Sequence, residues 1–150
     1  MIIGYTSGIF DLFHTGHLNI LKKAKENCDY LIIGLASNQY CKNAKGFYPI
    51  IDYNQRKTII KSIKYVDKVI KRNDSTYPNT KIDIAFKGTD WKNSNRGFKL
   101  EKYLKKKNIK LKYIPYTKTI SSTIIKRRIK WPLESTTKQK KWIIPTQKKH

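Results

Sequence analysis

Short apolar runs and amphipathic stretches alternate along most of this chain. Runs rich in Ile, Leu, Val, Phe and Tyr indicate buried strands at residues 2–6, 30–35, 66–70, 82–86 and 111–114. Elsewhere apolar positions recur at helical spacing, which predicts helices at residues 15–27, 54–64, 98–107 and 121–130. The stretch from residue 37 to 48 is rich in Asn, Lys and Gly and is expected to form a loop. Strands that alternate with helices in this way predict a parallel sheet covered by helices.

The expected fold is α/β: a single Rossmann-like domain with a doubly wound, five-stranded parallel sheet and helices on both faces. The inward faces expected for the first two helices carry Leu18, Leu21, Ala24 and Cys28 in one and Ile59, Ile60 and Ile63 in the other. Sheets of this type bind their ligands beyond the carboxyl ends of the strands, where the strand order reverses. The end of the first strand is therefore the first place to look for function.

The C-terminal residues differ in composition from the rest of the chain. Pro132 is expected to end the last helix, and the residues after it are mostly Ser, Thr, Gln and Lys. Residues 142–144, Trp-Ile-Ile, form a single apolar anchor there. We therefore divide the chain into a domain over residues 1–130 and a basic extension over residues 131–150.

Lysine dominates the charge of the chain. The formal net charge is +23, from 28 Lys and five Arg against ten acidic residues. Dense positive charge is typical of nucleic-acid-binding proteins, but 22 Ile and ten Asn accompany the lysines, and all three have A/T-rich codons. Arg, the better phosphate ligand, is scarce. We therefore expect a solvated lysine surface that attracts small anionic substrates rather than a nucleic-acid partner.

The sequence also bears on the compartment. No stretch reaches the roughly 18 apolar residues of a membrane span, and residues 1–4 are too short and uncharged for a signal peptide. Cys28 and Cys41 form no C-x-x-C pair and are expected to be reduced thiols, with Cys28 in the core. A cytoplasmic protein without a membrane partner is the resulting expectation.

The stretch GIFDLFHTGH at residues 8–17 places two histidines three residues apart where a strand gives way to a helix. Gly8 is expected to permit a tight turn and Gly16 to let a ligand approach the backbone. His17 enters the first helical turn, where free N–H groups favour anions. Imidazoles placed there would stabilise charge that develops during phosphoryl or nucleotidyl transfer. Core or surface histidines are the alternative, whereas a zinc site lacks further ligands at suitable spacing.

Several blocks together resemble the H-x-G-H nucleotidyltransferase superfamily, in particular its cytidylyltransferase branch. In chain order they are GIFDLFHTGH at 8–17, KG at 45–46, PII at 49–51, YNQRK at 53–57, KYVDKVI at 64–70, GTDW at 88–91 and ISSTIIK at 120–126. The pattern is most similar to that of the glycerol-3-phosphate cytidylyltransferases. The resemblance implies an Mg²⁺-dependent, homodimeric enzyme that transfers CMP from CTP to a phosphorylated small alcohol such as glycerol 3-phosphate, giving a CDP-alcohol and pyrophosphate.

The resemblance also implies roles for individual residues. His14 and His17 would contact the CTP phosphates and stabilise the pentavalent α-phosphorus, and Lys45 would bind the acceptor's phosphate as a third catalytic residue. Asp11 would orient the site or help to hold Mg²⁺. Further nucleotide-binding residues would be Gly8, Ile9, Phe10, Asp11, Gly88, Asp90, Trp91, Ser121, Ser122 and Thr123, and further substrate-binding residues Arg56 and Lys64.

One block departs from the family pattern. Tyr116 stands where the glycerol-phosphate enzymes carry an Arg, so a bidentate phosphate ligand is missing there. Lys118 or Arg127 is a possible substitute cation, and Lys64 also replaces a frequent Arg. Two other functions stay open: an adenylyltransferase of the same fold that uses ATP, and a non-catalytic module that binds nucleotide or nucleic acid. Phe10 and Trp91 can also be read as core aromatics.

Overall fold

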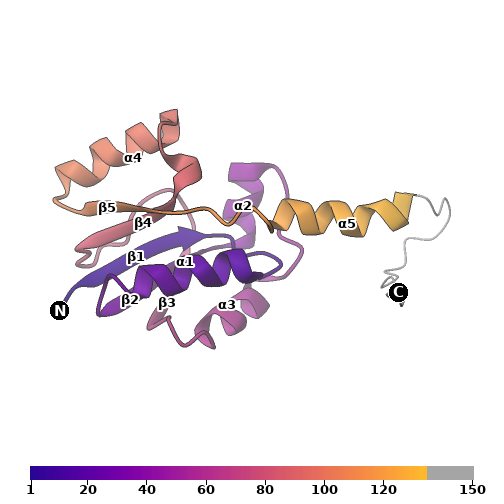
Figure 1. The fold of residues 1–150 in the computed structure, drawn as a ribbon, viewed down its shortest axis with the longest axis horizontal. Coiled ribbons are helices and arrows are strands. Elements are labelled where there is room, and N and C mark those ends of the chain that lie inside the picture. The colour runs from indigo at the N-terminus through magenta and orange to yellow at the C-terminus, as the bar shows by residue number, and fades with distance from the viewer. Residues whose placement is uncertain (135–150) are drawn as a thin grey trace.

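Five parallel strands form the centre of the protein (Figure 1). The computed structural model describes the backbone of residues 1–134 and the side chains of residues 1–129. The strands are β1 (Ile3–Gly8), β2 (Tyr30–Ala36), β3 (Lys68–Arg72), β4 (Ile84–Gly88) and β5 (Lys110–Ile114), in the order β3-β2-β1-β4-β5. β1 pairs with β2 on one side and with β4 on the other, all in parallel. The strand order therefore reverses at β1, which confirms the predicted doubly wound sheet.

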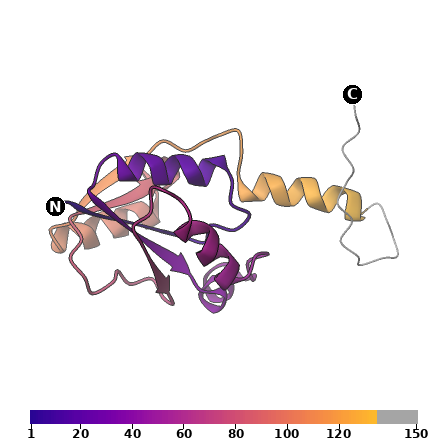
Figure 2. The ribbon, with the colours of Figure 1, turned by 90° about the horizontal axis from the view of Figure 1, so that it is seen from below.

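Helices cover both faces of the sheet (Figure 2). On one face, Leu21 of α1 (Thr15–Lys25) and Ile60 of α3 (Tyr53–Lys61) pack with the buried β2 residues Leu31, Ile33 and Leu35. On the other face, a second apolar cluster around Tyr5 and Ile32 includes Ile109, which follows α4 (Asn95–Lys106). Alternate β2 residues enter the two clusters, as the pleat of a strand requires.

The predicted loop over residues 37–48 is wrong, because it contains helix α2 (Asn38–Lys45). Ser37 caps the helix by accepting the Tyr40 amide at 3.0 Å. Gly46 ends it in a left-handed conformation, with φ of 83°. Only Cys41 of this helix is buried, so it carries no apolar stripe that the hydrophobic pattern could show. The helix follows the carboxyl end of β2 and carries Lys45 in its last turn.

Two further expectations need correction. Ile59 was expected to face inward but is 37% exposed, whereas its neighbour Ile60 is fully buried; adjacent helical positions point about 100° apart. The last helix, α5 (Ser122–Glu134), continues two residues beyond Pro132. Proline removes one amide donor and favours a kink, but it does not always terminate a helix. The Trp-Ile-Ile anchor predicted at 142–144 lies outside the described residues.

The third and fourth strands each begin and end two residues later than predicted. Cys28 and Cys41 are free thiols, and Cys28 packs at the edge of the core next to Gly4. The short 3-10 helix η1 (Thr89–Trp91) follows β4 directly. Within the described residues, no helix is both long and apolar enough to cross a membrane. Figures 1 and 2 show α5 extending away from the sheet, with only its N-terminus close to the strands.

Candidate active site

The loop between β1 and α1 holds two residues in left-handed backbone conformations. Phe10 and Leu12 both have φ of 52°, which residues other than Gly seldom adopt. Asp11 lies buried between them, and its two oxygens accept the amides of Ile50 at 2.8 Å and Ile51 at 2.9 Å. Strained backbone persists where surrounding contacts impose it, and it is concentrated at functional sites. The carboxyl end of β1 is therefore fixed by contacts with a segment forty residues away.

The glycines of this motif make room for neighbouring rings. The chain turns after Gly8, as expected, but the left-handed conformations of this turn belong to Phe10 and Leu12 and not to Gly8. A Cβ on Gly8 would lie 3.0 Å from the Phe10 ring, and a Cβ on Gly16 would lie 2.8 Å from the His14 ring. The second distance is shorter than real Cβ atoms tolerate. Gly16 therefore allows the His14 ring to lie against the backbone of α1.

His14 and His17 form a reciprocal cap at the start of α1. His14 is the N-cap residue, and its Nδ1 accepts the Gly16 amide at 3.0 Å. His17 in turn accepts the His14 amide on its own Nδ1 at 3.3 Å. The two rings stack with their centroids 3.8 Å apart. This is the geometry of a capping box, in which imidazoles replace the usual hydroxyl and carboxylate.

The cap determines which ring nitrogen of each histidine is free. Because both Nδ1 atoms accept amide hydrogens, each neutral ring carries its proton on Nε2. Burial lowers the pKa of His14. Burial and the neighbouring His14 lower the pKa of His17 to about 3, against the opposing charge of Asp11. Both rings are therefore neutral at pH 7, and each has an Nε2–H that the cap does not use.

The N-terminus of α5 lies beside that of α1. The Ile120 carbonyl oxygen is 3.5 Å from the position that a Cβ on Gly16 would take. The Ser122 hydroxyl donates to the Asp11 carbonyl oxygen at 2.7 Å, and the Ser121 hydroxyl accepts an amide of the first turn of α5 at 3.1 Å. Two helix N-termini, each the positive end of a helix dipole, thus approach one loop. Such an arrangement is suited to phosphate groups.

Comparison with known proteins identifies the family. A family model described as cytidylyltransferase-like matches residues 5–128. The chain belongs to the cytidylyltransferase-like family. The glycerol-3-phosphate cytidylyltransferases of Staphylococcus aureus and Bacillus subtilis are both 34% identical to it, over 83% of this chain and 92% and 94% of their own lengths. The lipopolysaccharide core biosynthesis protein of Thermoplasma volcanium superposes with a TM-score of 0.61 at 28% identity, over 80% of this chain and 99% of that one.

This cytidylyltransferase-like protein is therefore a nucleotidyltransferase, as the sequence blocks implied. The predicted nucleotide-binding residues of its N-terminal motif and of the start of α5 lie together around the β1–α1 loop. Phe10 contributes a core side chain, 7% exposed, whose ring centroid is 5.3 Å from that of His17. Thr123 is exposed in the first turn of α5. Contacts of these residues with a nucleotide stay a prediction.

Arg56 has a different environment from the one predicted. Its side chain is 1% exposed, and its guanidinium donates four hydrogen bonds. The acceptors are the carbonyl oxygens of Ile9, Ala36 and Ile51 and the Oδ1 of Asn38. Four of its five N–H groups are thus engaged inside the protein. A role in binding the acceptor's phosphate does not fit this arrangement; Arg56 instead ties the ends of β1 and β2 to α2 and α3.

Asp11 is the predicted magnesium ligand, and its surroundings bear on that role. Mg²⁺ in proteins prefers carboxylate and other oxygen ligands, but each Asp11 oxygen already accepts a backbone amide, and Lys126 Nζ lies 3.6 Å from Oδ2. In the part of the chain with described side chains, no group of three or more His, Cys, Asp or Glu residues is placed to hold a metal. The surroundings of Asp11 therefore favour the site-orienting role over the ligand role.

The two predicted substrate lysines lie at opposite ends of the strands. Lys45 is exposed in the last turn of α2, near the carboxyl ends of the strands. Lys64 lies between α3 and the start of β3, with its Nζ 5.3 Å from the Tyr65 ring centroid. Because β3 and β1 run in the same direction, the start of β3 is remote from the histidines. Substrate binding by Lys64 does not fit its position within one chain.

The predicted GTDW block lies at the carboxyl ends of the strands, as the histidines do. A Cβ on Gly88 would overlap the Asp90 carboxylate, so this glycine lets Asp90 fold back over the end of β4. Trp91 is half-buried, with Lys87 Nζ at 4.6 Å and the Arg96 guanidinium at 4.8 Å from its ring centroid. Lys87 was not singled out in the sequence. The signal that could have found it is a lysine inside the apolar strand IAFKG.

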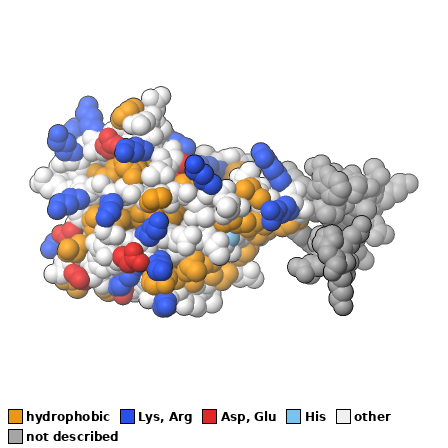
Figure 3. All heavy atoms as spheres, viewed as in Figure 1, with side chains coloured by type: hydrophobic (Ala, Val, Ile, Leu, Met, Phe, Trp, Pro, Cys, Tyr) orange, Lys and Arg blue, Asp and Glu red, His pale blue; other side chains and the backbone are white. Residues whose placement is uncertain are grey.

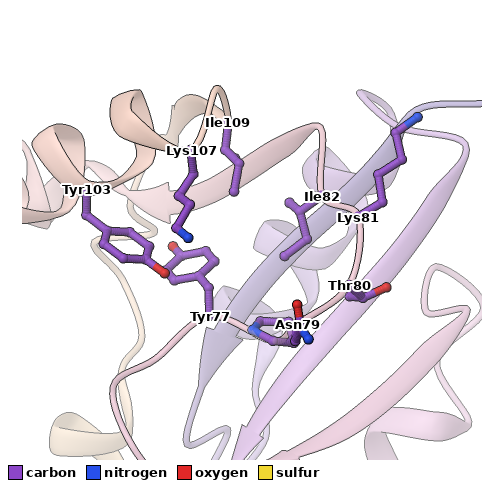
Figure 4. Close-up of a pocket in the computed structure, with 9 residues that line it drawn as sticks. Tyr77, Asn79, Thr80, Lys81, Ile82, Tyr103, Lys107 and Ile109 are labelled. Atoms are coloured by element: carbon purple, nitrogen blue, oxygen red, sulfur yellow. The ribbon is translucent and has the colours of Figure 1, made fainter.

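A separate pocket lies near the amino ends of β4 and β5, at the other end of the strands from the histidines (Figure 4). Its volume is about 350 Å³. It is lined by residues that precede β4 and β5 and by part of α4, among them Tyr77, Ile82, Tyr103, Lys107 and Ile109. None of the predicted site residues lines it. The pocket is therefore distinct from the histidine site.

Proposed function

We propose that this nucleotidyltransferase transfers CMP from CTP to a phosphorylated small alcohol, with glycerol 3-phosphate as the first candidate. The choice of nucleotide and acceptor is supported by the two glycerol-3-phosphate cytidylyltransferases that match more than nine-tenths of their own length. The observation that carries the proposed chemistry is the histidine cap, because it leaves two neutral Nε2–H donors side by side at the start of α1.

In the proposed reaction, a phosphate oxygen of the acceptor attacks the α-phosphorus of CTP. A new bond forms between that oxygen and the α-phosphorus, and the bond from the α-phosphorus to the bridging oxygen of the β-phosphate breaks, so pyrophosphate leaves with the electron pair. Negative charge grows on the oxygens around the α-phosphorus and on the leaving group. The Nε2–H groups of His14 and His17 donate to these oxygens, and the N-termini of α1 and α5 add their dipoles. Neither histidine needs to accept a proton, in agreement with their lowered pKa values.

The remaining predicted contacts belong to this proposal. Lys45, at the end of α2, would approach the acceptor, and the backbone of residues 8–10 would contact the nucleotide. Gly88, Asp90 and Trp91 would line the base and ribose. Both Asp11 oxygens already accept backbone amides, and no cluster of metal ligands is found among the residues with described side chains, so we expect magnesium to accompany the triphosphate rather than to be held by Asp11.

The roles of the histidines can be separated from their roles in folding. In His14→Asn and His17→Asn, the amide oxygen takes the place of Nδ1 and still accepts the backbone amide, but the Nε2–H donor is lost. Loss of one such donor is expected to lower the rate of pyrophosphate release by about 10²- to 10³-fold. Lys22→Asn, on an exposed position of α1, is the matched control. Full activity in both histidine variants would contradict the mechanism.

The same assay decides between the open alternatives. Wild-type protein with CTP, glycerol 3-phosphate and Mg²⁺ is expected to release pyrophosphate faster than with ATP at equal concentration. A preference for ATP would identify an adenylyltransferase instead. Tight binding of CTP without pyrophosphate release, over a panel of phosphorylated alcohols, would identify a non-catalytic module.

A further inference from the structure

Three side chains from three strand ends meet on the α4 face of the sheet. This group, here called the Ser7 cluster, consists of Ser7 in β1, Arg72 at the end of β3 and Lys87 in β4. Lys87 Nζ donates to the Ser7 hydroxyl oxygen at 3.0 Å, and Arg72 Nη1 donates to the same oxygen at 3.3 Å. One hydroxyl thus holds two cationic side chains close together.

Among the described residues, no carboxylate forms an ion pair with the Ser7 cluster. Lys87 is only 8% exposed, and the Nε of Arg72 is buried without a hydrogen-bond partner among the described residues. The ion pairs found in the described part of the chain all lie elsewhere: Lys25–Asp67, Lys81–Asp83 and Lys126–Asp11. Burial lowers the pKa of Lys87 to about 8; Arg72 adds to this shift, and the more distant Asp90 carboxylate opposes it. A buried ammonium next to a half-buried guanidinium, with no carboxylate in direct contact, is costly to a fold.

Aromatic contacts compensate for this cost only in part. The Arg72 guanidinium lies 5.1 Å from the Tyr40 ring centroid, and Lys87 Nζ lies 4.6 Å from that of Trp91. Cation–π contacts are weaker than the desolvation of a buried charge, and they leave the Nε–H of Arg72 unused. An anion that arrives with the substrate would supply the missing partner.

The position of the cluster favours an acceptor over an unrelated anion. It lies at the carboxyl ends of β1, β3 and β4, and the histidine cap follows the same end of β1. After burial and Arg72, and against the opposing Asp90, the cations Arg96 and Lys45 also lower the Lys87 pKa, so the Lys45 ammonium acts on the same region. Ser7 and Arg72 are half-buried and within reach of a ligand. Tyr116 stands where the resembling enzymes carry an Arg, and its side chain is not a cation. The Ser7 cluster supplies cations that this position lacks.

We propose that the Ser7 cluster binds the phosphate monoester of the acceptor substrate. Arg72 offers Nε–H and Nη1–H on one edge, which suits two oxygens of a phosphate. Lys87 offers its ammonium, and the Ser7 hydroxyl, which accepts from both cations, holds them side by side. The substrate's identity rests on the proposed function, whereas the presence of an anion site rests on the cluster alone.

A binding experiment tests the anion site without any turnover. The probe is inorganic phosphate, added at constant ionic strength while the thermal midpoint is measured. Phosphate is expected to raise the midpoint of the wild type, and the rise should be lost in Lys87→Met and in Arg72→Gln. Lys107→Met, an exposed lysine at the other end of the strands, should keep it. An equal rise in the cluster variants and the wild type, or no rise in the wild type, would overturn the proposal.

Steady-state kinetics then test which substrate the cluster serves. In both cluster variants the KM for glycerol 3-phosphate is expected to rise at least about ten-fold, the effect of losing one good ionic contact, while the KM for CTP stays within about two-fold. An equal rise in the KM for CTP would contradict an acceptor site and would show that the cluster binds the nucleotide instead. If the wild type releases no pyrophosphate with any acceptor, the proposed function fails, and the phosphate experiment still decides the anion site.

Discussion

At the scale of single residues, the two ring nitrogens of each histidine have different roles. Each Nδ1 belongs to the fold, because it completes the cap of α1, and each Nε2 is left for chemistry. The H-x-G-H spacing follows from this division, since the ring of the N-cap residue must reach one amide and the ring three residues later must reach back. Glycine between them is required because the first ring lies against its Cα.

The low pKa of His17 predicts a specific dependence of stability on pH. In the folded state its pKa is about 3, and in the unfolded state it is close to the reference 6.5. The unfolded state therefore binds more protons below pH 6.5, and the stability that neutral His17 provides, complete above that pH, is lost progressively as the pH falls toward 3. At pH 5 this loss should reach about 2 kcal/mol.

The comparison of wild type with His17→Asn isolates this effect, because the variant keeps the cap but does not titrate. Urea unfolding at pH 7 and at pH 5 gives the two free energies of unfolding for each protein. The wild type should lose more stability than the variant over this interval. Parallel losses would show that His17 is protonated in the folded state near its ordinary pKa.

Some single-residue roles are visible in the sequence and others are not. The histidine pair could be found because its spacing and its place after a strand carry the information locally. Asp11 and Arg56 stand in equally recognisable blocks, but their partners lie up to 47 positions away in the chain. A motif indicates that such a residue matters, whereas only its contacts show whether it binds a ligand or holds two segments together.

At the scale of elements, hydrophobic periodicity predicted the five strands and four of the helices but not α2. That helix has one buried side chain, so its sequence contains no apolar stripe. Its boundaries were nevertheless present in the sequence as Ser37 and Gly46, the residue types that begin and end helices. Capping residues are therefore the better signal for short polar helices at the edge of a sheet.

Arg56 connects these elements, and its replacement should separate structure from binding. Arg56→Met leaves three carbonyl oxygens and the Asn38 side chain without their donor. Buried acceptors without partners are costly, so the free energy of unfolding should fall by about 3 kcal/mol. The exposed Arg128→Met should change it by less than about 0.5 kcal/mol. A variant with unchanged stability and a raised KM for the acceptor would instead restore Arg56 as a substrate ligand.

At the scale of the whole molecule, the positive charge on the face drawn in Figure 3 is distributed rather than concentrated. Figure 3 shows Lys and Arg side chains spread over one face, separated by apolar and acidic ones. A nucleic-acid-binding surface more often presents a continuous basic patch or groove. A spread charge of +23 still creates a positive field around the protein, which attracts a triphosphate and a phosphorylated alcohol alike.

This distribution of charge predicts that salt changes the rate at which substrate binds but not the rate of the reaction of bound substrate. Raising NaCl from about 20 to about 300 mM should lower kcat/KM for CTP, because screening weakens the attraction of the anionic substrate. The value of kcat should change little, because the histidine cap and the two helix N-termini act on substrate that is already bound. A short DNA duplex at about 150 mM NaCl should bind more weakly than about 1 µM, as non-specific complexes do. Nanomolar binding with a steep salt dependence would instead show that the lysines form a nucleic-acid site, and a salt-independent kcat/KM would show that they do not guide the substrate at all.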